Sequence, residues 1–206
     1  MLSAHFACIS STTMKPSPIE FSFSALSCIY GCLALMCLPL EWIVSVAAAA
    51  AIHELSHILL LRMLDIPIFQ IKVELTGAVI QTAPLLPGQE FFCAAAGPMG
   101  SFLCLVLMRR FPLLALCGLA QGLFNLRPIY PMDGGRMLRA FTQLYAPRYS
   151  DSICRIAKYI CGFIICAGCF YLHIRTLDPI YILLGLYFLF QTLAKRRNIE
   201  YNIADF

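Results

Sequence analysis

Long apolar segments recur along the chain, and short polar stretches separate them. A helix needs roughly 20 apolar residues to cross a bilayer, and it satisfies its own backbone hydrogen bonds there. The pattern therefore predicts an all-α polytopic membrane protein with about six transmembrane helices, at residues 21–40, 42–62, 91–109, 112–126, 157–174 and 179–194.

Residues 66–88, between the second and third segments, follow a different pattern. Ile, Val and Leu alternate there with Gln, Lys and Glu, and Thr76-Gly77 interrupts the alternation. A period of two is typical of strands. The stretch predicts a membrane-associated β-hairpin around 68–81, which at membrane depth must be sheltered by protein or line a polar cavity. A plain loop outside the bilayer is the alternative.

The fourth segment ends in the sequence NLRPIYPMDGG, which interrupts the apolar pattern. Pro128 and Pro131 exclude a regular helix, so the backbone must unwind. Asp133 can then cap a new helix, with Gly134-Gly135 allowing a tight turn. That helix has apolar residues on one face and Arg or Gln on the other, which is typical of a helix lying at the membrane surface.

Composition supports a membrane protein and excludes several other classes. Of the 206 residues, 60% are hydrophobic and only 13% are charged, against about 25% charged in soluble domains. A net charge of +4, scattered along the chain, does not favour a nucleic-acid partner. Most of the 11 cysteines lie inside apolar segments, where free cysteine packs as a small hydrophobe.

The basic residues predict the orientation of the chain. With six spans, the two termini and the regions 63–90 and 127–156 lie on one side, together with twelve of the fifteen Lys and Arg residues. The positive-inside rule makes that side cytosolic. We expect a short cytosolic segment at 1–20, a six-helix membrane domain at 21–194 and a cytosolic tail at 195–206.

The second apolar segment contains His53-Glu54-Leu55-Ser56-His57, an HExxH motif. Residues four apart share one helix face, so both imidazoles can reach a single ion, and neutral imidazole suits zinc. Glu54 lies about 60° around the helix from His57, because a turn has 3.6 residues. It can border the same cavity as general base toward a water whose pKa the zinc lowers to about 7.

A catalytic zinc site needs a third protein ligand. The second and fourth segments both end on the cytosolic side, which brings Asp133 toward the two histidines, and the proline break lets the chain re-enter a cavity. Asp133 is the preferred ligand. The other candidates are Glu74, Glu90, Asp65, His173 and His5.

Asn125 ends the fourth segment, and two interpretations of its amide stay open. It could donate a hydrogen bond to a substrate carbonyl or its oxyanion. It could equally be an ordinary polar residue at the membrane interface.

These motifs together resemble the site-2 protease family of intramembrane zinc metalloproteases. The resemblance rests on HELSH at 53–57, on Gly97-Pro98, and on N-x-x-P-x-x-P-x-D-G at 125–134. It covers residues from about 42 to 145. The chain looks similar to the compact bacterial branch, which includes the sporulation protease that cleaves a sigma-factor precursor. One position departs from the family's G-P-x-x-N pattern, because Ser101 stands where Asn is common. We expect this difference to have only a modest effect on the protein, since Ser can still form hydrogen bonds and fits between closely packed helices.

The resemblance implies a function and a role for each matching residue. His53, His57 and Asp133 would hold one Zn²⁺ per chain, Glu54 would be the catalytic base, and Asn125 would assist substrate binding. The substrate would be a membrane-associated protein that adds as a strand to the hairpin, and inhibitory membrane partners would be possible. The resemblance also implies a bacterial inner membrane with both termini cytosolic.

Two other functions are compatible with a metal-binding membrane protein. A metal transporter would place acidic or His residues along several spans, and the first, third, fifth and sixth segments hold none deep within them. A catalytically silent regulatory relative would have lost the glutamate or a ligand, and Glu54 is present. The sequence therefore favours a zinc endopeptidase over both alternatives.

Overall fold

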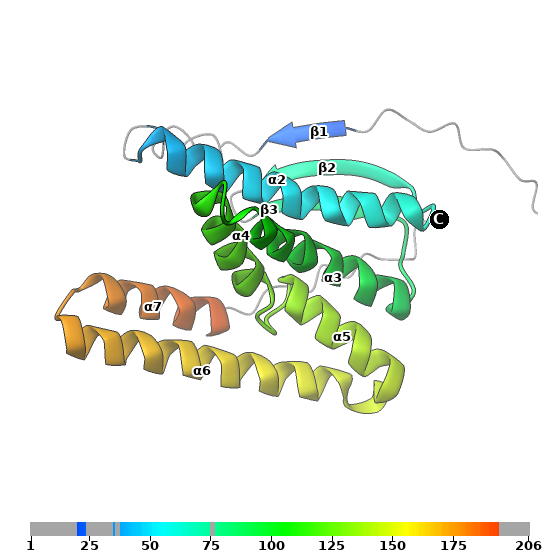
Figure 1. The fold of residues 1–206 in the computed structure, drawn as a ribbon. Coiled ribbons are helices and arrows are strands. Elements are labelled where there is room, and N and C mark those ends of the chain that lie inside the picture. Colours follow the sequence, from blue (N-terminus) through cyan, green and yellow to red (C-terminus); the bar gives the residue numbers. More distant parts are fainter. Residues whose placement is uncertain (1–19, 24–34, 36–37, 75–76, 194–206) are drawn as a thin grey trace, which may run out of the picture.

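The computed structural model describes residues 20–23, 35, 38–74 and 77–193, and its fold is mostly helical (Figure 1). A three-stranded sheet lies beside the helices. The helices are α2 (Leu40–Met63), α3 (Pro87–Leu103), α4 (Pro112–Asn125), α5 (Asp133–Tyr145), α6 (Ser150–Thr176) and α7 (Ile180–Leu193), with short 3-10 turns η1 (Cys104–Leu107) and η2 (Pro147–Tyr149).

Three helical segments of the described chain are long and apolar enough to cross a bilayer: Leu40–Met63, Pro87–Leu107 and Pro147–Thr176. Helices α4 and α7 are apolar but shorter. The prediction of a helical membrane protein is confirmed at this level, whereas six spans are not. The first predicted span is wrong where it begins, because strand β1 (Glu20–Phe23) occupies its first residues. Residues 24–34 and 36–37 of that span lie outside the described residues.

The predicted hairpin is confirmed, and the alternative of a plain loop is wrong. Strands β2 (Ile68–Glu74) and β3 (Gly77–Thr82) pair antiparallel, and residues 75–76 between them lie outside the described part. The sequence pattern did not predict β1, which pairs parallel to β2. Among the described strands the order is β1-β2-β3, so β3 lies at an edge of this sheet.

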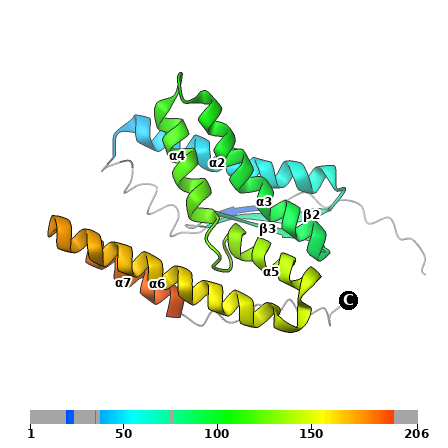
Figure 2. The same ribbon diagram turned by 60° about the horizontal axis from the view of Figure 1, so that its bottom comes forward.

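Helix α3 lies at the centre of the fold and contacts α2, α4 and α5 (Figures 1 and 2). In its most apolar stretch 39% of the residues are buried, against 17% in α2 and 11% in α6. Small residues make the close contacts possible, because Gly100 of α3 lies against Ser56 of α2 and Gly118 of α4 lies against Cys104. Such residues allow membrane helices to approach closely.

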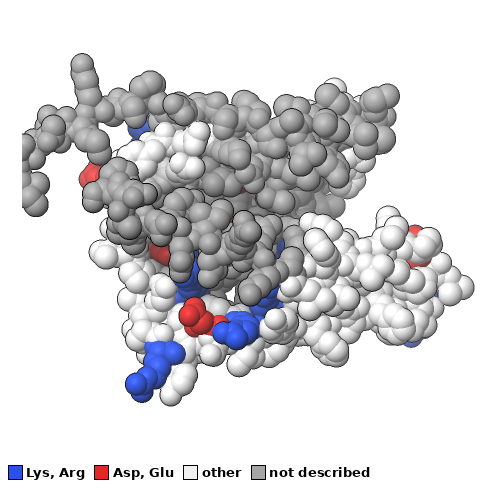
Figure 3. All heavy atoms as spheres, turned by 180° about the vertical axis from the view of Figure 1, so that it is seen from behind, with Lys and Arg blue, Asp and Glu red and all other residues white. Residues whose placement is uncertain are grey.

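Helices α6 and α7 form an antiparallel pair on one side of this core (Figure 2). Gly162 of α6 faces Thr192 of α7 at their contact. Helix α6 begins at Ser150, so it includes the last part of the region 127–156, which the six-span prediction places between two transmembrane helices. On the face seen from behind, most of the visible charged side chains gather toward the α5 end, and much of the visible α6–α7 pair shows no charged side chain (Figure 3). This distribution suits an apolar surrounding for the pair.

Gly100→Ala tests the close contact between α2 and α3. A Cβ at Gly100 would collide with the hydroxyl of Ser56 and lie 2.8 Å from its Cβ. We expect the free energy of unfolding to fall by about 1–3 kcal/mol, the usual range for overpacking, measured by thermal unfolding in detergent. Gly88→Ala on the same helix is the control, because nothing lies within 4 Å of its Cβ position. Equal stability of the two variants would contradict this packing.

Candidate metal centre

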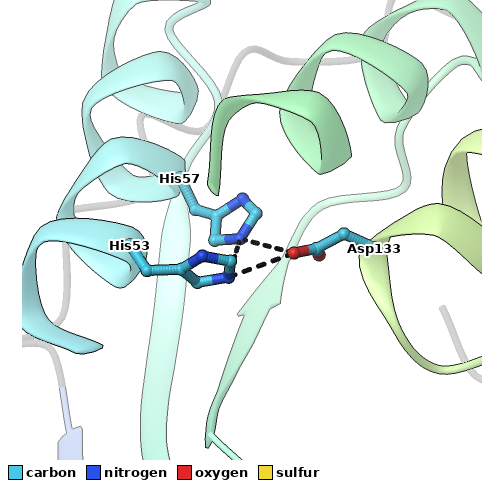
Figure 4. Close-up of side chains that lie close together, drawn as sticks. All are labelled: His53, His57 and Asp133. Atoms are coloured by element: carbon cyan, nitrogen blue, oxygen red, sulfur yellow. Dashed lines mark hydrogen bonds and ion pairs between the residues drawn. The ribbon is translucent and has the colours of Figure 1, made fainter. Parts of the chain in front are cut away.

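His53 and His57 lie one helical turn apart on α2 and are both buried, with 3% and 7% of their surface exposed. Their rings point from α2 toward the start of α5 (Figure 4). The four-residue spacing predicted a shared helix face, and the structure brings the Nε2 atoms to 3.3 Å from each other.

Asp133 reaches the two histidines from the first residue of α5. The chain turns tightly before it, since a Cβ on Gly134 would collide with the carbonyl of Leu126 and one on Gly135 with the backbone of Tyr130. The prediction that Asp133 caps the helix is wrong, because Met132 occupies the N-cap position and no side chain caps the helix there. The carboxylate of Asp133 faces the histidines instead (Figure 4).

The three side chains have the spacing of ligands around one ion. Oδ2 of Asp133 lies 3.1 Å from Nε2 of His53 and 3.4 Å from Nε2 of His57. Ligand atoms about 2.0–2.1 Å from a tetrahedral zinc ion lie about 3.3 Å from one another. Among the described His, Cys, Asp and Glu residues, these three form a group that could hold a metal ion.

Two further observations fit a metal between these atoms. Oδ2 of Asp133 is buried without a hydrogen-bond partner, although both imidazoles are near, and such an atom normally has a partner. Gly97 of α3 faces the same atoms, because a Cβ there would collide with Nε2 of His57 and lie 2.7 Å from Nε2 of His53. Only a glycine leaves that space open.

The remaining polar atoms of the three groups also have contacts. Nδ1–H of His57 donates to the carbonyl of Cys93 at 2.7 Å, and Nδ1 of His53 lies 2.8 Å from Oγ of Ser101. Nη1 of Arg136 lies 4.0 Å from Oδ1 of Asp133. Partners of this kind fix the orientation of metal ligands.

The charge state of Asp133 suits a ligand. Burial alone would raise the pKa of its carboxyl, but close polar contacts with His53 and His57, and their charge, lower it to about 2. The carboxylate is therefore ionised at neutral pH, the form in which it binds metals.

A cavity of about 150 Å³ opens beside the three ligands. Glu54 and Asn125, the predicted catalytic residues, both border it. Ile80 and Thr82 of β3 form another part of its wall. The site thus combines a metal-binding group, a carboxylate, an amide and the edge strand of the sheet.

Among the side chains that the structure describes, the candidates Glu90, His173 and Asp65 do not join this group. Glu90 lies 3.5 Å from Nε of Arg136, which links α3 to α5. His173 lies at the end of α6, where Nδ1–H donates to the carbonyl of Asp178. Asp65 is exposed after α2, and Glu74 is the last residue of β2. His5 lies outside the described residues.

Sequence reasoning missed several residues of the site. Arg136 and the carbonyl of Cys93 were not predicted, and a backbone carbonyl has no sequence signal. Ser101 was noted only as a departure from a motif. Ile80 and Thr82 follow from the alternation of the hairpin, which places residues two apart on one face, but the pattern did not say which face meets the site.

Gly97→Ala should block the metal centre without changing any ligand. The added methyl group would collide with both Nε2 atoms, so we expect zinc affinity to fall at least about tenfold, as for other changes next to ligands. Zinc content of protein purified in detergent and chelator competition measure this. Gly168→Ala is the control, since nothing lies within 4 Å of that position. Wild-type zinc affinity in Gly97→Ala would argue against a metal at these atoms.

Comparison with known proteins finds similarity to a curated protein sequence and to solved protein structures. No protein-family model matches the sequence. A zinc metalloprotease of Methanocaldococcus jannaschii is 33% identical over 106 residues, an alignment that covers 45% of this chain and 31% of the relative. The chain thus matches about a third of that protein's length.

One of these solved structures is a site-2 protease from the same organism. It superposes with a TM-score of 0.54 at 23% sequence identity, covering 85% of this chain and 88% of that chain. This likeness shows a shared fold. The predicted resemblance to the site-2 protease family is therefore confirmed at the level of the fold: the chain has the fold of a site-2 protease, with a candidate metal centre of two histidines and an aspartate at its core.

Proposed function

We propose that the chain is an intramembrane zinc metalloendopeptidase. The observation that supports this most directly is the buried group of His53, His57 and Asp133, whose polar atoms lie 3.1–3.4 Å apart beside a cavity bordered by Glu54. The name of the sequence relative, a zinc metalloprotease, favours zinc as the ion. Imidazole and carboxylate ligands agree with that choice.

When bound, zinc would supply Lewis-acid chemistry, polarising a peptide carbonyl and lowering the pKa of water to about 7. His53, His57 and Asp133 would hold the ion. Glu54 would take a proton from the attacking water and pass it to the leaving amine, as a general base and then a general acid. Glu54 borders the cavity from the same helix as the two imidazoles.

Asn125 and β3 would hold the substrate at the metal. The Asn125 side chain borders the cavity from the last residue of α4, where its amide could donate to the carbonyl oxygen that becomes negative during attack. Strand β3 borders the cavity through Ile80 and Thr82 and has an outer edge. An extended substrate could add there as a strand, with backbone hydrogen bonds giving affinity.

The proposed substrates are membrane-associated proteins cut in or near a membrane segment, for example a transcription-factor precursor. This proposal is supported by the location of the cavity among apolar helices. We further propose six spans in a domain at 21–194, flanked by cytosolic segments at 1–20 and 195–206, in a bacterial inner membrane. Inhibitory membrane partners remain part of the proposal, and a sporulation role stays a prediction.

Glu54→Gln separates hydrolysis from metal binding. The amide keeps the shape of the side chain but cannot accept the proton, so we expect cleavage to fall by about 100-fold or more with zinc content unchanged. Tagged single-span membrane proteins co-expressed with each variant would report cleavage on a gel. Glu41→Gln in the exposed first turn of α2 is the matched control. Cleavage that persists in Glu54→Gln would disprove this mechanism.

An epitope tag tests the proposed orientation. Placed after Phe206, it should be digested by an external protease only after the cells are permeabilised, because the positive-inside rule makes that end cytosolic. The same tag inserted at 108–111, between α3 and α4, should be digested in spheroplasts, in which the outer membrane has been opened. Digestion of the C-terminal tag in spheroplasts with an intact inner membrane would contradict the orientation.

A further inference from the structure

The two histidines of the metal centre are held by different kinds of partner. Nδ1 of His57 faces the carbonyl of Cys93, which can only accept, so Nδ1 must hold the proton and Nε2 is free to bind a metal. Nδ1 of His53 faces the hydroxyl of Ser101. The tautomer of His53 therefore depends on one side chain.

Ser101 of α3 contacts His53, one of the three residues of the proposed metal centre. It lies one turn after Gly97 on α3, is fully buried at 0% exposure, and has its Oγ 2.8 Å from Nδ1 of His53. A hydroxyl can accept one hydrogen bond while donating another. Ser101 can thus accept from Nδ1–H without giving up its own donor.

We propose that Ser101 is a positioning residue for the metal centre. Its hydroxyl oxygen accepts a hydrogen bond from Nδ1–H of His53, which holds the ring in the tautomer and orientation that turn Nε2 toward Nε2 of His57 and Oδ2 of Asp133. The proposal rests on the metal centre proposed above. It assigns a role to the position where the chain departs from the G-P-x-x-N pattern.

The proposal predicts what happens when the hydroxyl is lost. In Ser101→Ala the Nδ1–H of His53 would be buried beside a methyl group, so the ring would lose the bond that fixes its tautomer. Loss of such a partner typically lowers metal affinity 10–100-fold. A residue that only fills space would change stability and leave the affinity of the folded protein unchanged.

Zinc affinity of the full chain, purified in detergent and titrated against a chelator, tests this directly. We expect Ser101→Ala to bind zinc 10–100-fold more weakly than wild type. Cys104→Ala is the matched control, because Cys104 is also buried on this helical segment and its thiol contacts the Gly100 carbonyl instead of a histidine. It should lose stability but keep wild-type affinity.

A second variant, Ser101→Cys, and a second measurement test the role of Ser101 even if Ser101→Ala does not fold. Ser101→Cys retains the volume with a weak acceptor, so it should bind zinc less well even if Ser101→Ala does not fold. Cobalt substituted for zinc should give an altered visible spectrum in either variant. Wild-type affinity and spectrum in Ser101→Cys would overturn the role of Ser101.

Asp133→Asn distinguishes failure of this proposal from failure of the metal centre. If wild type binds zinc and Asp133→Asn does not, the centre stands and the Ser101 variants decide the positioning role. If Asp133→Asn binds zinc as wild type does, the centre is wrong and the role of Ser101 falls with it.

Discussion

The fold depends on placing two imidazoles and a carboxylate within 3.4 Å of one another among apolar helices. Polar and ionisable groups are costly in such surroundings and are usually paired or functional there. Here they point at one another, and Oδ2 of Asp133 has no hydrogen-bond partner. A shared cation would satisfy all three groups at once, which explains why they converge.

Helix α3 makes this convergence possible, although it supplies no ligand. Gly97 lets its backbone pass against both histidines, and Gly100 lets it pass against Ser56 one turn further on. The same helix provides the Cys93 carbonyl and the Ser101 hydroxyl that contact the outer nitrogens of the imidazoles. The central position of α3 thus serves packing and metal geometry together.

The sequence predicted the parts of the site that depend on spacing and on chain breaks. The four-residue interval of His53 and His57 fixed their shared face, and the prolines before Asp133 indicated an unwound chain that could bring it back. Asn125 and Glu54 border the cavity as expected. The hairpin was visible as an alternation of apolar and polar residues.

The features that sequence reasoning missed depend on contacts between distant segments. The parallel pairing of β1 with β2 joins residues about fifty positions apart. In the sequence, the four residues of β1 cannot be told from the start of a helix by their pattern alone. The contact of Ser101 with His53 arises only when α3 packs on α2. The position of Ile80 and Thr82 of β3 at the cavity likewise depends on how the sheet packs against the helices.

X-ray absorption at the zinc edge, on the purified full chain, tests the central claim most directly. The account predicts one zinc per chain with a shell of nitrogen and oxygen atoms at about 2.0–2.1 Å, the outer scattering of two imidazoles, and no sulfur at about 2.3 Å. A sulfur shell, or zinc that is absent or substoichiometric after reconstitution, would contradict a centre built from His53, His57 and Asp133.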